Sequence, residues 1–272
     1  MIKEYMKIGN LKKHISSVLV LVVLSVFTSC EKVIDLKLDE AEPVIVIDGG
    51  ISDLNVNHKI RISKTYSFTE PNKFNGVTGA VVVLTANGEN PIVFVEVSPG
   101  IYQSPKFKGK SGIRYELTVT FEGKTYKASS IMPARVTLDS LTFKTFNFFG
   151  ENNSYIVANF SDPAGIPNQY RYILKAKGVI EEDAVSEDRF NDGNKVANVI
   201  FYELDDLIKG DSVNVEFQCV DKEVYRYFYS LGQNSGEGGP PVAPANPPSN
   251  FSNGALGVFN AHTSSSRTAV IK

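Results

Sequence analysis

Residues 115–124 read YELTVTFEGK, and this stretch decides the fold class. Its apolar residues Tyr115, Leu117 and Val119 alternate with polar ones, which is the period of a β-strand that buries one face. Gly123 then marks a turn, and a second alternating segment follows it. The stretch therefore predicts a β-hairpin with one face in a core.

The same pattern recurs on both sides of this hairpin. Asn87-Gly88 and Ser98-Pro99-Gly100 are turn signals between short β-branched segments. About seven such strands fit between residues 43 and 135, which favours an immunoglobulin-like or prealbumin-like β-sandwich. Residues 136–272 resume the pattern as a second β-rich domain. We therefore predict an all-β protein of two sandwich-like units.

One short segment changes to the helical period. Asp221 can cap a helix over residues 222–231, with Gly232 at its end. Val224 and Phe228 then share the apolar face of this helix. The sequence thus predicts one short helix near the C-terminus.

Two segments of the second β-rich domain are expected to be irregular. Residues 178–195 are acidic and read as a loop, and residues 233–250 are rich in Gly, Pro, Asn and Ser. Two final strands are expected at Leu256–Ala261 and Thr268–Ile271.

Residues 15–30, ISSVLVLVVLSVFTSC, form an apolar run that is too short for a transmembrane helix. Lysines precede it, and two small residues and Cys30 end it, which is typical of a bacterial lipoprotein signal. We expect residues 1–29 to be a signal peptide, Cys30 to be lipidated and residues 30–42 to be a tether. The alternatives are an ordinary cysteine after a plain signal, or a run that stays uncleaved as a membrane anchor.

Composition excludes several classes of function. The chain has a formal net charge of −2 and no basic tract, so nucleic acid is not an expected partner. Cys219 is the only cysteine besides Cys30, which leaves no internal disulfide in the mature chain. Its strand-like surroundings favour a buried, unreactive thiol.

The search for catalytic motifs finds none. His58 and His262 have no metal-spaced neighbours, so each is expected at the surface or at a sheet edge. We therefore expect a non-enzymatic protein with no cofactor and no metal. The acidic residues Glu181-Glu182-Asp183, Glu187-Asp188 and Asp192 could take up Ca²⁺ through oxygen ligands, although a solvated loop is the preferred interpretation.

Candidate binding residues are few. Two aromatic groups could stack on sugars, Phe143–Phe149 with Tyr155 and Tyr225–Tyr229, although core packing explains both. Tyr227 lies off the apolar helix face and is the aromatic residue expected to be most exposed. Pro240 and Pro241 would limit the entropy lost on binding in loop 233–250, which is otherwise a plain connector.

Two triplets, Asp139-Ser140-Leu141 and Asp211-Ser212-Val213, match the short Asp-Ser-aliphatic pattern at which some bacteria attach O-glycans. We treat each triplet as a candidate glycosylation site.

Seven segments in order along the mature chain carry a family resemblance. They are Ser29–Asp35, Val77–Val82, Ser98–Tyr102, Gly123–Ala128, Phe160–Gly165, Asp188–Gly193 and Pro248–Phe259. Together they resemble the Bacteroidota outer-membrane lipoproteins grouped as domain of unknown function 4249. The last segment departs slightly, with Ala255 inserted where such chains often run Gly-Leu-Gly.

This resemblance implies an exported β-rich lipoprotein that is often found beside TonB-dependent outer-membrane transporters. We expect a membrane-anchored accessory protein that captures ligand or packs against the transporter. The alternative is a structural or adhesive role in the cell envelope. The sequence fits either a periplasmic or an outward-facing placement at the outer membrane.

Overall fold

The computed structural model describes residues 42–66, 74–148, 151–202, 207–234 and 246–271, and eleven of the strands in these ranges form one sheet. In sheet order they are β11 (Val179–Glu187), β10 (Gln169–Ala176), β13 (Ser212–Val220), β14 (Leu256–Val270), β1 (Ile45–Ser52), β2 (Val56–Lys64), β5 (Ile101–Phe107), β4 (Glu89–Ser98), β3 (Val81–Ala86), β6 (Arg114–Phe121) and β7 (Lys124–Ile131). A second sheet contains β12 (Lys195–Ile200), β9 (Glu151–Ser161) and β8 (Leu138–Phe148).

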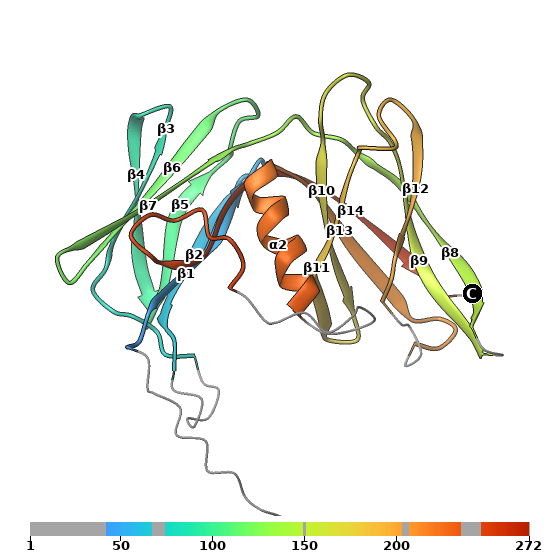
Figure 1. The fold of residues 1–272 in the computed structure, drawn as a ribbon, viewed down its shortest axis with the longest axis horizontal. Helices are drawn as coiled ribbons and strands as arrows, with labels where there is room; N and C mark the ends of the chain where they lie inside the picture. Colours follow the sequence, from blue (N-terminus) through green and yellow to red (C-terminus); the bar gives the residue numbers. More distant parts are fainter. Residues whose placement is uncertain (1–41, 67–73, 149–150, 203–206, 235–245, 272) are drawn as a thin grey trace, which may run out of the picture. The chain divides into compact units, whose positions relative to one another are not determined.

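Helix α2 (Lys222–Asn234) is the one helix in these ranges, and it packs against β11, β10 and β14 (Figure 1). The all-β prediction with one short C-terminal helix is therefore confirmed. The helix begins where the sequence predicts and continues three residues beyond the expected end at 231.

Strand β14 lies in the interior of the large sheet, although it is the last of the described strands in the sequence. It pairs in parallel with β1, aligning Val46 with Leu256, and antiparallel with β13. The segment just before β14 also contacts β7, the edge strand at the other end of the sheet order from β11. There the Ser252 amide donates to Lys127 O at 2.8 Å, and Phe251 bridges to Ala128. β14 thus connects the strands of both halves of the chain.

Two large hydrophobic cores stabilise the protein. One is formed by apolar residues of β1–β7 together with Phe251, Phe259 and Ala261, and the other by residues between Val136 and Cys219. The hairpin of the opening stretch behaves as its pattern predicts, since Leu117 and Val119 are fully buried in the first core. A third, small cluster joins α2 to the sheet through Val220, Val258 and helix residues.

Two local predictions are wrong. Residues 179–187 form edge strand β11 instead of an acidic loop, and they pair with β10. Residues 256–270 form one strand of 15 residues, where two shorter strands with a break at 262–267 were expected. The polar segment at that break is held as strand because β13 pairs along it.

The division into domains 43–135 and 136–272 stays a prediction. Contacts group Glu42–Lys272 into one compact unit. The signal segment 1–29 and nearly all of the tether lie outside the described residues.

Candidate functional site

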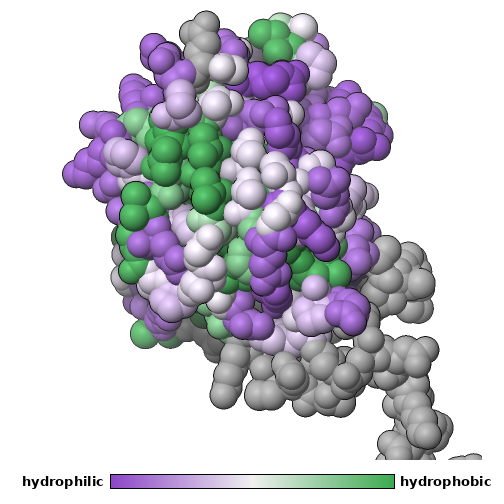
Figure 2. All heavy atoms as spheres, turned by 90° about the vertical axis from the view of Figure 1, so that its left-hand side faces the viewer, coloured by the Kyte–Doolittle hydropathy of each residue, from purple (hydrophilic) through white to green (hydrophobic). Residues whose placement is uncertain are grey.

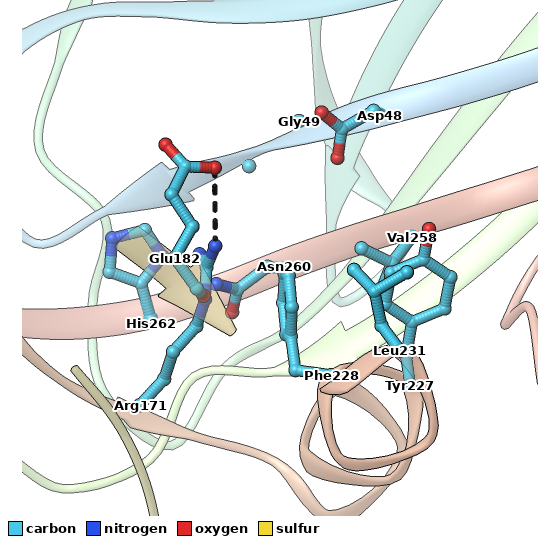
Figure 3. Close-up of a pocket in the computed structure, with 11 residues that line it drawn as sticks. Asp48, Gly49, Arg171, Glu182, Tyr227, Phe228, Leu231, Val258, Asn260 and His262 are labelled. Atoms are coloured by element: carbon cyan, nitrogen blue, oxygen red, sulfur yellow. Dashed lines mark hydrogen bonds and ion pairs between the residues drawn. The ribbon is translucent and has the colours of Figure 1, made fainter. Parts of the chain in front are cut away.

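A cavity of about 260 Å³ lies between helix α2 and the large sheet (Figure 3). Strands β1 and β14 form part of its wall, and their parallel register places Asp48 beside Val258 and Gly50 beside Asn260. Because alternate residues of a strand share a face, His262 follows Val258 and Asn260 on the same side of β14. Three residues of one short stretch thus line one cavity.

Helix α2 covers this cavity because its start is fixed. Asp221 Oδ1 accepts a hydrogen bond from the Val224 amide at 3.0 Å, which caps the helix. Phe228 and Val224 are buried against the sheet. Tyr227 and Leu231 lie on the neighbouring turns and line the cavity. The helix therefore supplies the apolar and aromatic wall of the site.

Arg171 on β10 brings a buried positive charge to the cavity. Its side chain is 8 % exposed, its guanidinium carbon lies 3.6 Å from the centroid of the Phe228 ring, and Nε donates to Glu182 O at 2.7 Å. Nη2 also lies 3.5 Å from the Glu182 carboxylate. A buried cation needs such partners because removal from water is costly. Arg171 therefore joins β10, β11 and α2 at one point.

Asn260 and His262 form the buried polar floor of the cavity. Asn260 is 4 % exposed and His262 is 9 % exposed. Asn260 Nδ2 donates to Gln218 Oε1 at 3.1 Å, but Asn260 Oδ1 and His262 Nδ1 have no hydrogen-bond partner among the described residues. Such buried unpaired atoms are rare in native proteins. These two atoms distinguish this cavity from two further cavities, whose lining residues do not include an unpaired buried side-chain atom.

The electrostatics of the cavity follow from partial burial. Burial lowers the pKa of His262 to about 4, against an opposing effect of the Glu216 carboxylate, so the ring is neutral at pH 7. Removal of the carboxyl group from water raises the pKa of Asp48, although Arg171 and Arg61 act in the opposite direction. Asp48 nevertheless keeps some contact with solvent, since the residue as a whole is exposed. The site thus combines a neutral imidazole, an amide, a guanidinium and two carboxylates.

Figure 3 shows how these groups are distributed. Arg171, Glu182 and His262 gather at one end of the cavity, and Tyr227 and Leu231 lie at the other. The arrangement offers hydrogen-bond donors and acceptors beside an apolar wall, which is the usual composition of a small-molecule site.

Of the candidate binding residues Tyr227, Pro240 and Pro241, Tyr227 lines this cavity. Its side chain is partly buried, so the expectation that it is the most exposed aromatic of its group is wrong, and Tyr229 with 51 % exposure takes that position. Pro240 and Pro241 lie outside the described residues, as does Cys30.

The two histidines are also placed differently from the prediction. His58 is buried, with Nδ1 accepting from the Ser52 amide at 3.3 Å and Nε2 at 3.1 Å from Phe107 O. His262 lies in a central strand and not at an edge. The spacing of Val258, Asn260 and His262 at every second residue could have predicted that His262 shares a strand face with them. Cys219 is buried as expected, and burial raises the pKa of its thiol.

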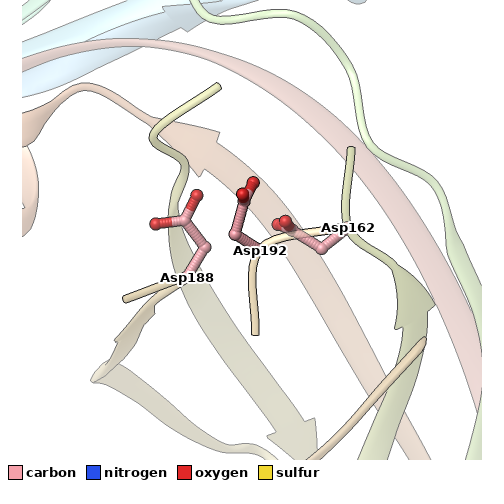
Figure 4. Close-up of side chains that lie close together, drawn as sticks. All are labelled: Asp162, Asp188 and Asp192. Atoms are coloured by element: carbon pink, nitrogen blue, oxygen red, sulfur yellow. The ribbon is translucent and has the colours of Figure 1, made fainter. Parts of the chain in front are cut away.

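The acidic residues separate into two groups. Glu181 and Glu182 lie on β11, whereas Asp188 and Asp192 meet Asp162, with one carboxylate oxygen from each within 4.8 Å of the others (Figure 4). Asp162 and Asp188 are buried, so the solvated-loop interpretation is wrong for Asp188.

Hydrogen bonds explain why these three carboxylates meet. Asp188 Oδ2 accepts from the Asn168 amide at 2.7 Å and Asp192 Oδ1 from the Gly165 amide at 2.7 Å. Asp162 accepts from the Tyr170 hydroxyl and from the Gly193 amide. The cluster therefore clamps two loops together, and its oxygens are the described groups closest to a cation-binding geometry.

The remaining candidates lie outside the cavity. Ser140 and Ser212 of the two glycosylation triplets are exposed on β8 and β13, and their modification stays a prediction. Of the aromatic group near Tyr155, that residue is buried, while Phe143 and Phe146 are partly exposed.

An all-β architecture with one helix laid over a polar cavity defines a β-sheet protein with a candidate small-molecule site. The family model described as Domain of unknown function (DUF4249) matches residues 31–268, so the chain belongs to this family. A search of curated proteins gives no match. Within the described ranges, helices fall short of the length and apolar character that a membrane crossing needs.

Proposed function

We propose that the protein is a non-enzymatic lipoprotein of the bacterial outer membrane that assists a TonB-dependent transporter by capturing a small ligand. Lipidation at Cys30 would anchor it, since two or three acyl chains hold a protein firmly at a bilayer. The signal-like residues 15–30 and the resemblance to Bacteroidota lipoproteins support this placement.

One observation favours ligand capture over simple packing against the transporter. The cavity under α2 contains two buried polar atoms, Asn260 Oδ1 and His262 Nδ1, that lack a partner within the described residues. A core evolved only for stability would pair or replace them. A bound ligand would supply the missing partners.

A structural or adhesive role is the second candidate. Four exposed valines on β3 and β4 favour it: Val81, Val93, Val95 and Val97. The side of the protein that carries these strands shows a contiguous apolar area (Figure 2). Apolar patches on soluble surfaces often mark contacts with other macromolecules.

Pull-down from native membranes tests the proposal. We expect the wild-type protein to recover a TonB-dependent transporter, and we expect Cys30→Ala to leave the membrane fraction. Recovery of matrix or surface material without a transporter would favour the adhesive role. Mass spectrometry that finds an N-terminus other than lipidated Cys30 would overturn the anchoring.

A further inference from the structure

The orientation of the Asn260 amide is fixed by a chain of hydrogen bonds. Gln218 Nε2 donates to Glu216 Oε1 at 2.8 Å, which leaves Gln218 Oε1 as the acceptor for Asn260 Nδ2 at 3.1 Å. Rotating the Asn260 amide by half a turn would place two oxygens against each other. Its unpaired carbonyl oxygen is therefore a consequence of the network.

His262 continues the same polar row toward Ser264. The Ser264 hydroxyl donates to Glu216 at 3.3 Å, and the Ser264 amide donates to Asp53 at 3.0 Å. Both polar groups of Ser264 therefore have hydrogen-bond partners. Two residues before it, His262 Nδ1 has no hydrogen bond of ordinary geometry within the described residues, although the Asn260 backbone acts on the ring. Since the ring is neutral, Nδ1 can accept or donate, depending on the tautomer.

The groups around these two atoms have opposite hydrogen-bonding character. Asn260 Oδ1 and the carboxylates of Asp48 and Glu182 only accept, whereas the Arg171 guanidinium only donates. An ammonium group would suit the acceptors but would face the charge of Arg171. A carboxylate would suit Arg171 but would face Asp48 and Glu182. A hydroxyl group both donates and accepts at one atom, so it matches every member of the set.

The volume of the cavity and its apolar wall further restrict the class of ligand. A volume of about 260 Å³ lies below the range of roughly 300–1,000 Å³ typical of drug-sized ligands. Tyr227, Leu231 and Val258 supply an apolar wall opposite the polar floor. A ring with hydroxyls on its rim and C–H groups on its face is complementary to both.

We propose that the cavity between α2 and strands β1 and β14 binds a neutral, polyhydroxylated ligand of one ring, such as a monosaccharide, through Asn260 and His262. This inference rests on the ligand-capture form of the proposed function and names the class of ligand. The hydroxyls of the ligand pair with Asn260 Oδ1 and His262 Nδ1, and its C–H face packs on the helix wall.

Thermal unfolding of the purified full-length protein tests the proposal with D-glucose, D-galactose, D-mannose and N-acetylglucosamine as probes. Glycine and dialanine serve as zwitterionic comparisons of similar size. We expect at least one monosaccharide to raise the melting temperature by about 5–10 °C at a concentration of ~100 Kd, because only the folded state binds it. No shift with any monosaccharide, or a shift with the zwitterions alone, would overturn the proposal.

Two apolar variants separate binding from folding. His262→Phe removes one of the unpaired atoms, so we expect it to keep the melting temperature of the free protein or to raise it. Asn260→Leu removes the other unpaired atom together with the hydrogen bond to Gln218 Oε1, so we expect it to fold with a lower melting temperature. Each should weaken monosaccharide binding about tenfold or more, because a hydroxyl of the ligand loses its partner.

His58→Phe is the matched control. Both ring nitrogens of His58 are hydrogen-bonded and it lies outside the cavity, so this variant should lose stability and keep the monosaccharide shift. If Asn260→Leu and His262→Phe retain full binding, the site is refuted. If the protein recovers the transporter but binds none of the sugars, this inference alone is refuted. If it binds a sugar but recovers no transporter, only the accessory role is refuted.

Discussion

Asp221 accepts a 2.5 Å hydrogen bond from the hydroxyl of Ser130, although Asp221 caps helix α2 and Ser130 lies in strand β7. The same carboxylate oxygen accepts from the Ile131 amide at 3.0 Å. One side chain therefore sets both the start of the helix and its position over the sheet. The cavity depends on this residue because α2 forms one of its walls.

Asp221→Ala should lower the free energy of unfolding by about 2–3 kcal/mol, through loss of the cap and of the partner of Ser130. Asp221→Asn keeps a capping oxygen and should lose about half as much. Urea unfolding followed by circular dichroism measures both. Equal losses in the two variants would show that the cap itself contributes nothing.

Gly257→Ala should be strongly destabilising. Gly257 has a φ of +95°, and a Cβ there would lie 2.1 Å from Ile47 O on the neighbouring strand. Backbone strain adds about 1–2 kcal/mol for a non-glycine residue at positive φ, and the clash comes on top of it. We expect a loss of more than ~3 kcal/mol, or failure to fold.

Gly254→Ala is the control for this prediction. Gly254 also has a positive φ, of +74°, but a Cβ there meets nothing within 4 Å. Its loss should be limited to the strain of about 1–2 kcal/mol. Similar stability of the two variants would contradict the close approach of β14 to β1.

The stability of the protein should fall when the pH is lowered from 6.5 to 4. The pKa of His262 is lowered to about 4 by burial, whereas an unfolded histidine has a pKa near 6.5. Between these values the unfolded chain binds a proton that the folded chain does not, so the free energy of unfolding decreases by up to about 3 kcal/mol. Burial lowers the pKa of His58 as well, which acts in the same direction.

Urea titrations at pH 7 and pH 4.5 measure this dependence. His262→Phe should remove the share of His262 and flatten the profile between these values. An unchanged profile in the variant would assign the acid sensitivity to other groups.

Tyr170 and Asp162 should be energetically coupled. The hydroxyl of Tyr170 is buried and donates to Asp162 Oδ1. Asp162→Ala should cost about 2–3 kcal/mol because it leaves this hydroxyl unpaired, while the double variant with Tyr170→Phe should cost less than the sum of the single changes. A double-mutant cycle by chemical unfolding measures the coupling, and additive effects would disprove it.

Sequence periodicity predicts the strands whose two faces differ. Leu117 and Val119 alternate with polar neighbours and are buried where expected. Sequence periodicity does not predict β11, because Glu181 and Glu182 give this edge strand the composition of a loop. Sequence periodicity also divides β14 into two strands, because the segment around Ser265 is polar. This segment is a strand because β13 pairs along it. Local propensity carries no information about such neighbours.

The cavity could not be predicted from the sequence for a related reason. Asp48, Arg171 and Asn260 belong to three strands that are far apart along the chain, and only the sheet order and register bring them together. Asp221 and Val224 were readable as a helix start because capping is local. The helical period places Tyr227 off the face of Val224 and Phe228 and so predicts exposure, but the side chain is partly buried and lines the cavity.

The central position of β14 has a consequence for how the protein folds. The strand that separates β1 from β13 follows every other described strand in the sequence, so β1 acquires its parallel neighbour only when this distant segment joins the sheet. Until then β1 and β13 each present an unpaired edge, which favours aggregation of the partly folded chain. Removal of residues 256–270 should therefore yield a product that precipitates or is degraded instead of a shorter folded domain.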